Sequence, residues 1–439
     1  MSVAARGGRP ARAGHATFGT AIPAEQWFAL VVVLTLPFAW AFTLDLRFPF
    51  KVYEFALMLG AAAACAGGRL RAAPGTWRLL RPLWPFLAFV GAVLAVRALW
   101  PLPTADSSTF TSRFGSTGDG VAKYVYLLFG IFALVVCSHA AFAARQLYIR
   151  AWLAGAVVAS LYAWYLFGCS FLGVLPPLLP GSRPPQYLAV LGHEVIRSGP
   201  FQEGNHLGLY LVCSTAIALY ARRYSLAALF TGTAFVTFST VNVIALALLW
   251  LSTGWTATRR FRGTDRVAAV LSFSGLTAAV LLVLASTGYA AEVVFNKLGA
   301  NDSFSRGDRV NSSIAGVRMA IDYPVAGVGL SQYGAHYKAY QLTSLFDVNT
   351  ELKPVANNVY VELLSETGLV GTALMVLFWV ALYRRARGPE LTPLRWGLIG
   401  ILLVFTTFPS YTMMFLWPYW ALVAAAAAGS PHHLRRAAS

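Results

Sequence analysis

Long apolar runs alternate with short polar segments along almost the whole chain. Many of these runs reach or approach the roughly 20 residues that an α-helix needs to cross the hydrocarbon core of a bilayer. Their number and spacing predict twelve membrane-spanning helices. The expected spans centre on residues 27–44, 52–67, 83–99, 121–137, 152–172, 207–220, 225–238, 241–255, 267–285, 360–383, 397–408 and 412–428.

The composition supports this pattern. Hydrophobic residues make up 57% and charged residues only 12% of the 439 positions, which lies outside the range of soluble globular proteins. The spans and their connections use nearly all of the chain, and we recognise neither an internal repeat nor a soluble domain. We therefore expect an all-α polytopic membrane protein that forms a single domain over residues 1–439.

Basic residues indicate how the spans are oriented. Loops rich in lysine and arginine stay in the cytoplasm, and with a cytoplasmic N-terminus 21 of the 34 lysines and arginines fall on that side. Both termini are then cytoplasmic. Three long polar segments lie on the other side of the membrane, at residues 101–120, 176–205 and 289–357, and the last of them joins the ninth span to the tenth.

The net charge of +17 does not by itself indicate binding to nucleic acid. The basic residues are scattered among loops that also face the anionic head groups of membrane lipids. The four cysteines lie in or beside apolar runs without metal-ligand spacing, and we interpret them as small core residues. The first apolar run lacks a convincing cleavage site, so we interpret it as an uncleaved span rather than a signal peptide.

The exported segment 176–205 ends in GHEVIRSGPFQEGNHLGLYL, which leads directly into the sixth span. Gly199 and Pro200 interrupt the chain there, and Asn205 is a suitable residue to cap the helix. Arg197 then stands beside a helix N-terminus, where unpaired N–H groups and the helix dipole already favour anions. Arg197 forms part of an anion site in this interpretation. In the alternative, it only extends toward the membrane interface.

Helical spacing predicts an amphipathic helix at 305–323 within the third exported segment. Arg309 and Ser313 lie off its apolar stripe, and Arg306 lies at the edge. The helix is expected to stop at Pro324. Two functions stay open: a lid that rests on the membrane surface with its arginines on lipid phosphates, or a lid that also contributes to a substrate site. The stripe consists of Val310, Ile314, Val317 and Ile321.

The same segment re-enters the membrane through VANNVYVELLSETGLVG. Glu362 and Glu366 lie four residues apart, on one face of the tenth span. A carboxylate at membrane depth costs roughly 2.5–3.5 kcal/mol unless it is paired or hydrated. Three roles stay open for these two residues: structural pairing with outer arginines, substrate binding, and proton transfer.

Taken together, these motifs resemble the family of bacterial O-antigen ligases and O-antigen or exopolysaccharide polymerases. The resemblance runs from Arg197 to Gly371 and is most specific in DYPVAGVG and ELLSETGLVG. It implies a helical fold related to the GT-C glycosyltransferases, in the bacterial inner membrane. It also implies transfer of a glycan from an undecaprenyl diphosphate carrier to a glycan or lipid A core acceptor, at the periplasmic face and without a metal ion or cofactor.

The resemblance also assigns roles to residues. Arg197 and Arg309 are expected to stabilise the charge that develops on the diphosphate, because fixed guanidinium groups can replace a divalent metal there. Arg306 and Arg318 are expected to support them. The residues expected to contact substrate are Asn205, His336, Asn357, Asn358, Tyr360 and Glu362.

The sequence departs from the family pattern at two positions. Asn357 stands where related ligases usually carry the histidine that activates the acceptor, and asparagine cannot act as a base. Thr240, after Ser239, stands where a second arginine is common. Both departures favour a polymerase, or a ligase for a different glycan, over a strict lipopolysaccharide ligase. The candidate replacement bases are Glu203, His206, His336 and Glu366.

A polytopic transporter or flippase for lipid-linked oligosaccharide is the alternative function. Such a carrier would be expected to have related halves, helix breaks near the bilayer midplane and buried charges in several spans. Here the polar residues concentrate in outer loops and outer helix ends. This distribution favours transfer chemistry over transport and over a noncatalytic assembly subunit.

Overall fold

The structure is a computed structural model of the chain. It describes residues 24–38, 41–42, 44–45, 49–66, 73, 75–103, 115–182, 185–190, 193–258, 300–345, 354–408 and 410–429. The expected ninth span, 267–285, lies outside these residues, as do parts of each of the three long polar segments 101–120, 176–205 and 289–357.

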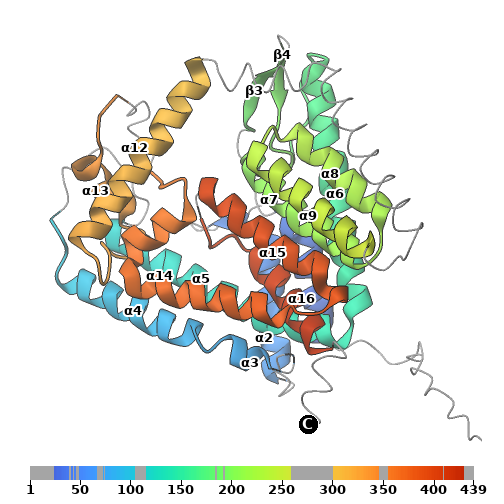
Figure 1. The fold of residues 1–439 in the computed structure, drawn as a ribbon, viewed down its shortest axis with the longest axis horizontal. Coiled ribbons are helices and arrows are strands. Elements are labelled where there is room, and N and C mark those ends of the chain that lie inside the picture. Colours follow the sequence, from blue (N-terminus) through green and yellow to red (C-terminus); the bar gives the residue numbers. More distant parts are fainter. Residues whose placement is uncertain are drawn as a thin grey trace, which may run out of the picture.

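Helices dominate the described residues (Figure 1). The α-helices are α1 (Ala24–Thr35), α2 (Val52–Ala66), α3 (Thr76–Leu79), α4 (Leu83–Leu99), α5 (Gly115–Ala143), α6 (Arg145–Phe171), α7 (Gly204–Tyr220), α8 (Tyr224–Val236), α9 (Thr240–Thr258), α12 (Ala300–Asp322), α13 (Tyr333–Tyr340), α14 (Val359–Arg385), α15 (Thr392–Val404) and α16 (Leu416–Ala428). Short 3-10 helices occur at Leu36–Phe38, Pro389–Leu391 and Phe405–Thr407.

Four helical stretches are long and apolar enough to cross a membrane: Thr117–Ala143, Arg145–Phe171, Val359–Arg385 and Pro389–Thr407. Six further apolar helices of 10–17 residues accompany them in the described residues. The protein is therefore a helical membrane-type protein. The total of twelve spans and the relation to the GT-C fold stay predictions.

Two short antiparallel hairpins interrupt the helices, which the all-α expectation did not include. They are formed by β1 (Leu44–Asp45) with β2 (Pro49–Phe50) and by β3 (Tyr187–Val190) with β4 (His193–Ile196). In the second hairpin Tyr187 pairs with Ile196. Val195 and Ile196 are buried, because this end of β4 packs against α6. The hairpin thus anchors segment 176–205 on the helices.

Close packing between α5 and α16 forms part of the core. A Cβ atom added at Gly130 would lie 2.3 Å from the ring of Trp417, so only glycine allows the two helices to approach this closely. The Tyr148 hydroxyl of α6 donates a 2.9 Å hydrogen bond to the carbonyl of Pro418. Trp152 Nε1 donates to Ser214 Oγ, also at 2.9 Å. These two polar side chains of α6 inside the apolar core are therefore satisfied by neighbouring helices.

Helix α7 is buried on nearly all of its faces. It packs against α8, α9 and α15, and these neighbours fix its position. A helix that is apolar all round is typical of the interior of a large bundle or a membrane protein. These contacts hold the first turn of α7 in a fixed position.

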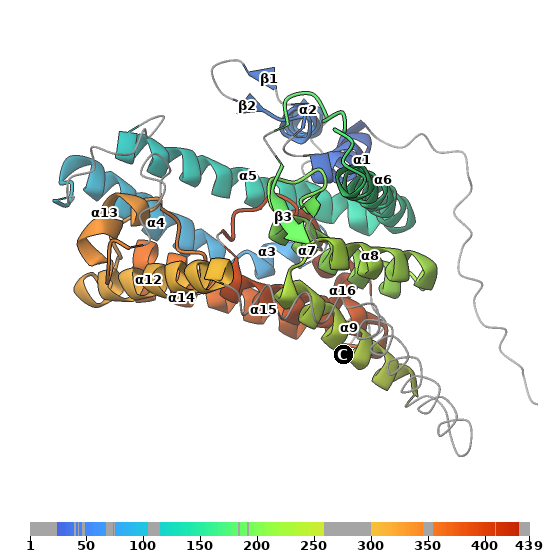
Figure 2. The same cartoon turned by 90° about the horizontal axis from the view of Figure 1, so that it is seen from above.

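Helices α12 and α13 lie beside α14 at one end of the molecule, next to the end of α4 (Figures 1 and 2). Helix α12 covers nearly the range predicted for the amphipathic helix and ends at Asp322, two residues before Pro324. A helix seldom continues through the residue that precedes proline. The predicted stop is therefore confirmed.

The loop after α12 inserts into a break in α14. The N–H groups of Val328 and Gly329 donate to the carbonyls of Ser365 and Glu366 at 2.8 and 3.1 Å. Leu369 returns a 2.8 Å hydrogen bond to the carbonyl of Pro324. The loop thus satisfies backbone groups that the break in the helix would otherwise leave unpaired.

Two glycines make this insertion possible. Gly327 has φ 65° and Gly368 has φ 63°, conformations that residues with a side chain rarely adopt. A Cβ at Gly327 would lie 2.4 Å from the Ser365 oxygen, and one at Gly368 would lie 2.3 Å from the Val325 oxygen. The motifs DYPVAGVG and ELLSETGLVG therefore encode the two halves of one backbone contact.

Candidate active site

Arg197 directly follows β4 and lies against the first turn of α7. Its backbone N–H extends the hairpin by donating to the Gln186 carbonyl at 3.1 Å, and its Nε donates to Gln186 Oε1 at 2.9 Å. The same side-chain oxygen accepts a 3.1 Å hydrogen bond from the N–H of Gly204. Gln186 therefore fixes the guanidinium beside the positive end of the α7 dipole.

Gly204 is required at this position by its neighbours. A Cβ there would lie 2.8 Å from the Thr237 carbonyl and 3.2 Å from Arg197 Cγ. Thr237 belongs to the corner between α8 and α9, so that corner, the arginine and the start of α7 meet at a single point. Contact this close holds the Arg197 side chain against the helix.

Arg309 of α12 is close enough to Arg197 for the two positive charges to interact. Burial lowers the pKa of Arg197 from its ordinary value, and the charge of Arg309 lowers it further, although Glu203 acts in the opposite direction. Neither arginine has a carboxylate within 4.0 Å in the described part of the chain. Two arginines that face one another without a direct carboxylate partner favour the binding of an anion, although the charge of Glu203 lies nearby.

The residues around the first turn of α7 complete this region. Glu203 is the N-cap of α7, without a side-chain capping bond, so the expectation that Asn205 caps the helix is wrong. Glu203 Oε2 lies 3.9 Å from His206 Nε2. The His206 ring packs edge-on against Phe408 with ring centres 5.1 Å apart, and neither ring nitrogen has a hydrogen-bond partner among the described residues.

Thr240, which stands where the family commonly carries a second arginine, is the first residue of α9. Ser239 is buried and accepts a 2.8 Å hydrogen bond from Asn242 Nδ2, which also donates to the carbonyl of Asn205 at 3.2 Å. Thr240 is exposed. The departure from the family pattern therefore falls close to the first turn of α7, where an arginine would have added to the charge of Arg197.

Helix α12 turns its apolar stripe away from the protein. Val310, Val317 and Ile321 are exposed and Ile314 is half-buried, whereas the face against α13 and α14 includes the buried residues Asn311, Ser312 and Met319. Asn311 Nδ2 donates to the Tyr337 hydroxyl at 2.8 Å and its Oδ1 accepts from the N–H of Leu342 at 2.7 Å. Ala315 and Met319 of the same face are completely buried in a cluster with Tyr333 and Tyr337, so polar contacts and apolar burial together hold this face of α12 in place.

The other two arginines of α12 differ from Arg309 in their surroundings. Arg306 is exposed. Arg318 is also exposed and donates from one terminal nitrogen to the carbonyls of Tyr340 and Gln341, at 3.2 and 3.3 Å. Arg318 therefore ties α12 to the end of α13.

The two glutamates of α14 pair with Lys123 of α5, not with outer arginines. Lys123 Nζ lies 2.5 Å from Glu362 Oε1 and 2.6 Å from Glu366 Oε2. The Tyr411 ring lies beneath the same ammonium group, 5.4 Å from its centre. Lys123 was not among the residues expected from the sequence. Its position inside an apolar span could have indicated it, because a lysine there requires a counter-ion.

The re-entry residues have structural roles. Asn358 caps α14 by accepting hydrogen bonds from the N–H groups of Tyr360 (2.9 Å) and Val361 (3.3 Å), and Asn357 adopts a positive φ of 51°. The Tyr360 hydroxyl donates a 2.6 Å hydrogen bond to the Leu402 carbonyl. None of these contacts involves Arg197 or Arg309.

His336 lies in a separate cavity of roughly 110 Å³ that also contains Arg97. Burial lowers the pKa of His336 to about 4, and the charge of Arg97 acts in the same direction. Eight of the thirteen expected site residues thus fall into three groups: Arg197, Glu203, Asn205, His206 and Arg309 near the start of α7; Glu362 and Glu366 with Lys123; and His336 with Arg97. The other five, Arg306, Arg318, Asn357, Asn358 and Tyr360, lie outside these groups.

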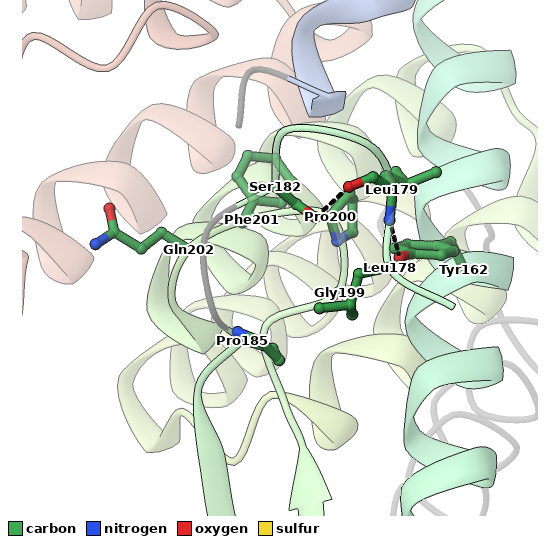
Figure 3. A pocket seen from close by; sticks show the side chains of 9 residues that line it. All are labelled: Tyr162, Leu178, Leu179, Ser182, Pro185, Gly199, Pro200, Phe201 and Gln202. Atoms are coloured by element: carbon green, nitrogen blue, oxygen red, sulfur yellow. Dashed lines mark hydrogen bonds between the residues drawn. The ribbon is translucent and has the colours of Figure 1, made fainter. Parts of the chain in front are cut away.

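A much smaller cavity lies beside Gly199, near the end of segment 176–205 (Figure 3). Its volume is about 10 Å³, which leaves room for roughly one water molecule. Across it, the Leu179 N–H donates to the Tyr162 hydroxyl at 3.2 Å. This cavity is too small to receive a sugar and belongs to the packing that supports Arg197.

Comparison with known families then identifies the central part of the chain. The sequence profile described as O-antigen ligase matches residues 225–376. This segment is therefore similar to the O-antigen ligase family. It includes α8, α9, α12, α13 and much of α14, and therefore Arg309, His336, Glu362 and Glu366. No match is found among curated proteins.

The family match confirms the resemblance stated from the motifs. It supports a ligase- or polymerase-like function in polysaccharide biosynthesis and an enzyme of the glycosyltransferase type. Substrates of this family are, in general, a lipid-linked glycan and an acceptor. Arg197 and Lys123 precede the matched segment, and the structure brings them to its residues Arg309 and Glu362.

Proposed function

We propose that this protein transfers a glycan from undecaprenyl diphosphate to a sugar acceptor at the periplasmic face of the bacterial inner membrane. The convergence of Arg197 and Arg309 is the observation that carries the proposal. Both arginines lie in segments that the distribution of basic residues assigns to the outside.

The positive charges of the two arginines match the negative charge of the diphosphate in the proposed donor. When the acceptor hydroxyl oxygen bonds to the anomeric carbon, the bond from that carbon to the diphosphate oxygen breaks and leaves its electron pair on the diphosphate. Guanidinium groups that are fixed in advance stabilise this charge in the transition state, as a divalent metal would. Gln186 and the contact with Gly204 fix Arg197 in this way.

The acceptor proton needs a base, and Asn357 cannot supply one. Glu203 and His206 lie nearest to Arg197, and the Glu203 side chain is 39% exposed. Glu366 is held by Lys123 and is only 4% exposed, which makes it less accessible to an incoming hydroxyl. We propose Glu203 as the group that receives the proton, with His206 beside it.

Substitution of each arginine tests this function. Arg197→Ala and Arg309→Ala are expected to abolish the polymer or the capped glycan, because removal of one such charge typically costs a factor of 100–1000 in rate. Arg150→Ala, an exposed arginine on α6, is the matched control. Normal glycan patterns in both variants, with normal membrane insertion, would remove the arginines from the mechanism.

Two further measurements test the orientation and the reaction. Val317→Cys on the exposed face of α12 is expected to react with an impermeant thiol reagent in intact cells, whereas Arg387→Cys is expected to react only after the membrane is permeabilised. A deletion strain is expected to accumulate outward-facing lipid-linked precursor. Inward-facing precursor would instead support a flippase.

A further inference from the structure

Helix α3 and the start of α4 present two exposed tryptophans and two exposed arginines. Trp77 and Trp84 are 50% and 48% exposed, and their rings stack with centres 6.5 Å apart and planes inclined by 16°. Arg78 and Arg81, which lie between them in the chain, are also exposed. We call these four residues the α3 patch. Tryptophan is enriched at the head-group level of a bilayer, where its ring meets apolar and polar surroundings together.

Contacts with α5 fix the backbone beneath the α3 patch. The N–H of Ala73 donates to Ser138 Oγ at 3.2 Å, and the Thr76 hydroxyl donates to the same oxygen at 3.4 Å. Thr76 and Ser138 are completely buried, and so is Leu80 on the turn between α3 and α4. The exposed side chains of the patch therefore stand on a backbone that the core holds in place.

Arg385, the last residue of α14, brings a third guanidinium to the α3 patch. Its Nη1 donates to the carbonyl of Gly75 at 2.9 Å, and its charge is close enough to that of Arg78 for the two to interact. Gly75 has φ 74°, and a Cβ at this position would collide with the Arg385 guanidinium. Glycine thus makes room for the arginine. The fold concentrates positive charge here although like charges repel.

The surroundings of the α3 patch contain little compensating negative charge. Neither Arg78 nor Arg81 has a carboxylate within 4.0 Å among the residues that the structure describes. The connection from α14 to α15 adds exposed Arg387 and one acidic residue, Glu390. Because Arg78 and Arg81 are both exposed, an anion outside the protein can reach them.

The position of the α3 patch indicates where that anion lies. The distribution of basic residues assigns this part of the chain to the cytoplasmic side. In Figure 1, α3 and the β3–β4 hairpin, which leads directly into Arg197, lie at opposite edges of the molecule. The patch is therefore remote from the arginine pair, and its tryptophans indicate the level of the phospholipid head groups.

We propose that the α3 patch binds an anionic phospholipid of the cytoplasmic leaflet, with its phosphate on Arg78 and Arg81 and its glycerol and upper acyl carbons against Trp77 and Trp84. The planar forks of two guanidinium groups match the oxygens of a phosphate. The two indole rings offer apolar surface that a free phosphate would leave uncovered. A basic cluster next to a membrane span is also the usual recognition element for anionic lipids. The proposal does not depend on glycan transfer.

Lipid binding to the purified, delipidated full-length protein in detergent tests the proposal. Phosphatidylglycerol is expected to bind saturably by native mass spectrometry. Phosphatidylcholine with the same acyl chains, and glycerol 3-phosphate, are expected to bind at least tenfold more weakly. Arg78→Gln and Arg81→Gln should each weaken phosphatidylglycerol binding about fivefold, and the double variant more than tenfold. Arg150→Gln removes an exposed arginine from the start of α6 and should bind phosphatidylglycerol normally.

Two further double variants separate the contributions to binding. Arg78→Lys/Arg81→Lys keeps both charges and should retain most of the affinity for phosphatidylglycerol. Trp77→Leu/Trp84→Leu should weaken phosphatidylglycerol binding about threefold or more and leave glycerol 3-phosphate binding unchanged.

Equal affinities for phosphatidylglycerol and phosphatidylcholine would overturn the proposal, as would normal phosphatidylglycerol binding in Arg78→Gln/Arg81→Gln. Glycerol 3-phosphate that binds as tightly as phosphatidylglycerol would show a site for free phosphate and overturn it as well. Arg197→Ala is expected to bind phosphatidylglycerol normally. The outcome is therefore distinguishable from that of the glycan-transfer experiments.

Discussion

Lys123 Nζ lies 2.5 Å from Glu362 Oε1 and so joins two helices that are separated by more than two hundred residues in the chain. A second carboxylate, that of Glu366, lies 2.6 Å from the same nitrogen. Both glutamates are almost completely buried. One ammonium group therefore pairs with two carboxylates inside the protein and links α14 to α5.

Removal of Lys123 is therefore expected to be costly. Lys123→Met leaves both carboxylates without a partner and should lower the free energy of unfolding by about 3–5 kcal/mol, measured by denaturation in detergent. The exposed control Arg150→Met should change it by no more than about 0.5 kcal/mol. The triple variant Lys123→Met/Glu362→Gln/Glu366→Gln should regain part of the loss, because it buries no unpaired charge. A Lys123→Met protein as stable as wild type would show that the ion pairs contribute nothing.

Because the loop inserts into α14, alanine substitution at two different glycines is expected to have very different effects on stability. Gly368→Ala places a Cβ 2.3 Å from the Val325 oxygen at a φ of 63°, and should destabilise the protein by about 2–5 kcal/mol through strain and crowding. Gly232→Ala is the control, because a Cβ there meets nothing within 4 Å. Unfolding temperatures of the two variants test this directly. Similar values for both would contradict the backbone contact.

Gln186 is expected to act as a positioning residue for Arg197. Gln186→Glu places a carboxylate on the Arg197 Nε, neutralises its charge and should raise the apparent KM for the lipid-linked donor about tenfold or more in reconstituted vesicles. Gln186→Ala removes the hydrogen bond but adds no charge, so its effect should be smaller. Gln146→Glu, at an exposed position on α6, controls for the added charge. If Gln186→Glu matches wild type in KM, Gln186 does not control Arg197.

His336 predicts a specific dependence of stability on pH. Its pKa is about 4 in the folded protein, against an ordinary value of 6.5, so the unfolded chain takes up the proton first as the pH falls. The contribution of His336 is therefore fully present above pH 6.5 and is lost between pH 6.5 and 4, by about 2 kcal/mol at pH 4.5. Unfolding of wild type and His336→Leu at pH 7 and 4.5 isolates this effect. An identical pH response in both proteins would contradict it.

Some of the site could be predicted because it depends on residues close together in the chain. Arg197 and the first turn of α7 are seven residues apart, so the glycine and proline between them sufficed to place the arginine beside a helix N-terminus. The amphipathic helix and its end before Pro324 follow from the same kind of local pattern. Lys123 was missed because its carboxylate partners lie 239 and 243 residues away.

The sequence by itself determined that the chain is apolar and helical, where α12 ends, and that the motifs are those of the O-antigen ligase family. These properties depend on composition, periodicity and short motifs, which need no knowledge of neighbouring elements. Only the tertiary structure decided that Arg309 approaches Arg197, that Lys123 pairs with Glu362, and that the apolar stripe of α12 faces outward. Those outcomes depend on which helices pack together, and many packings of similar apolar helices are compatible with one hydropathy pattern.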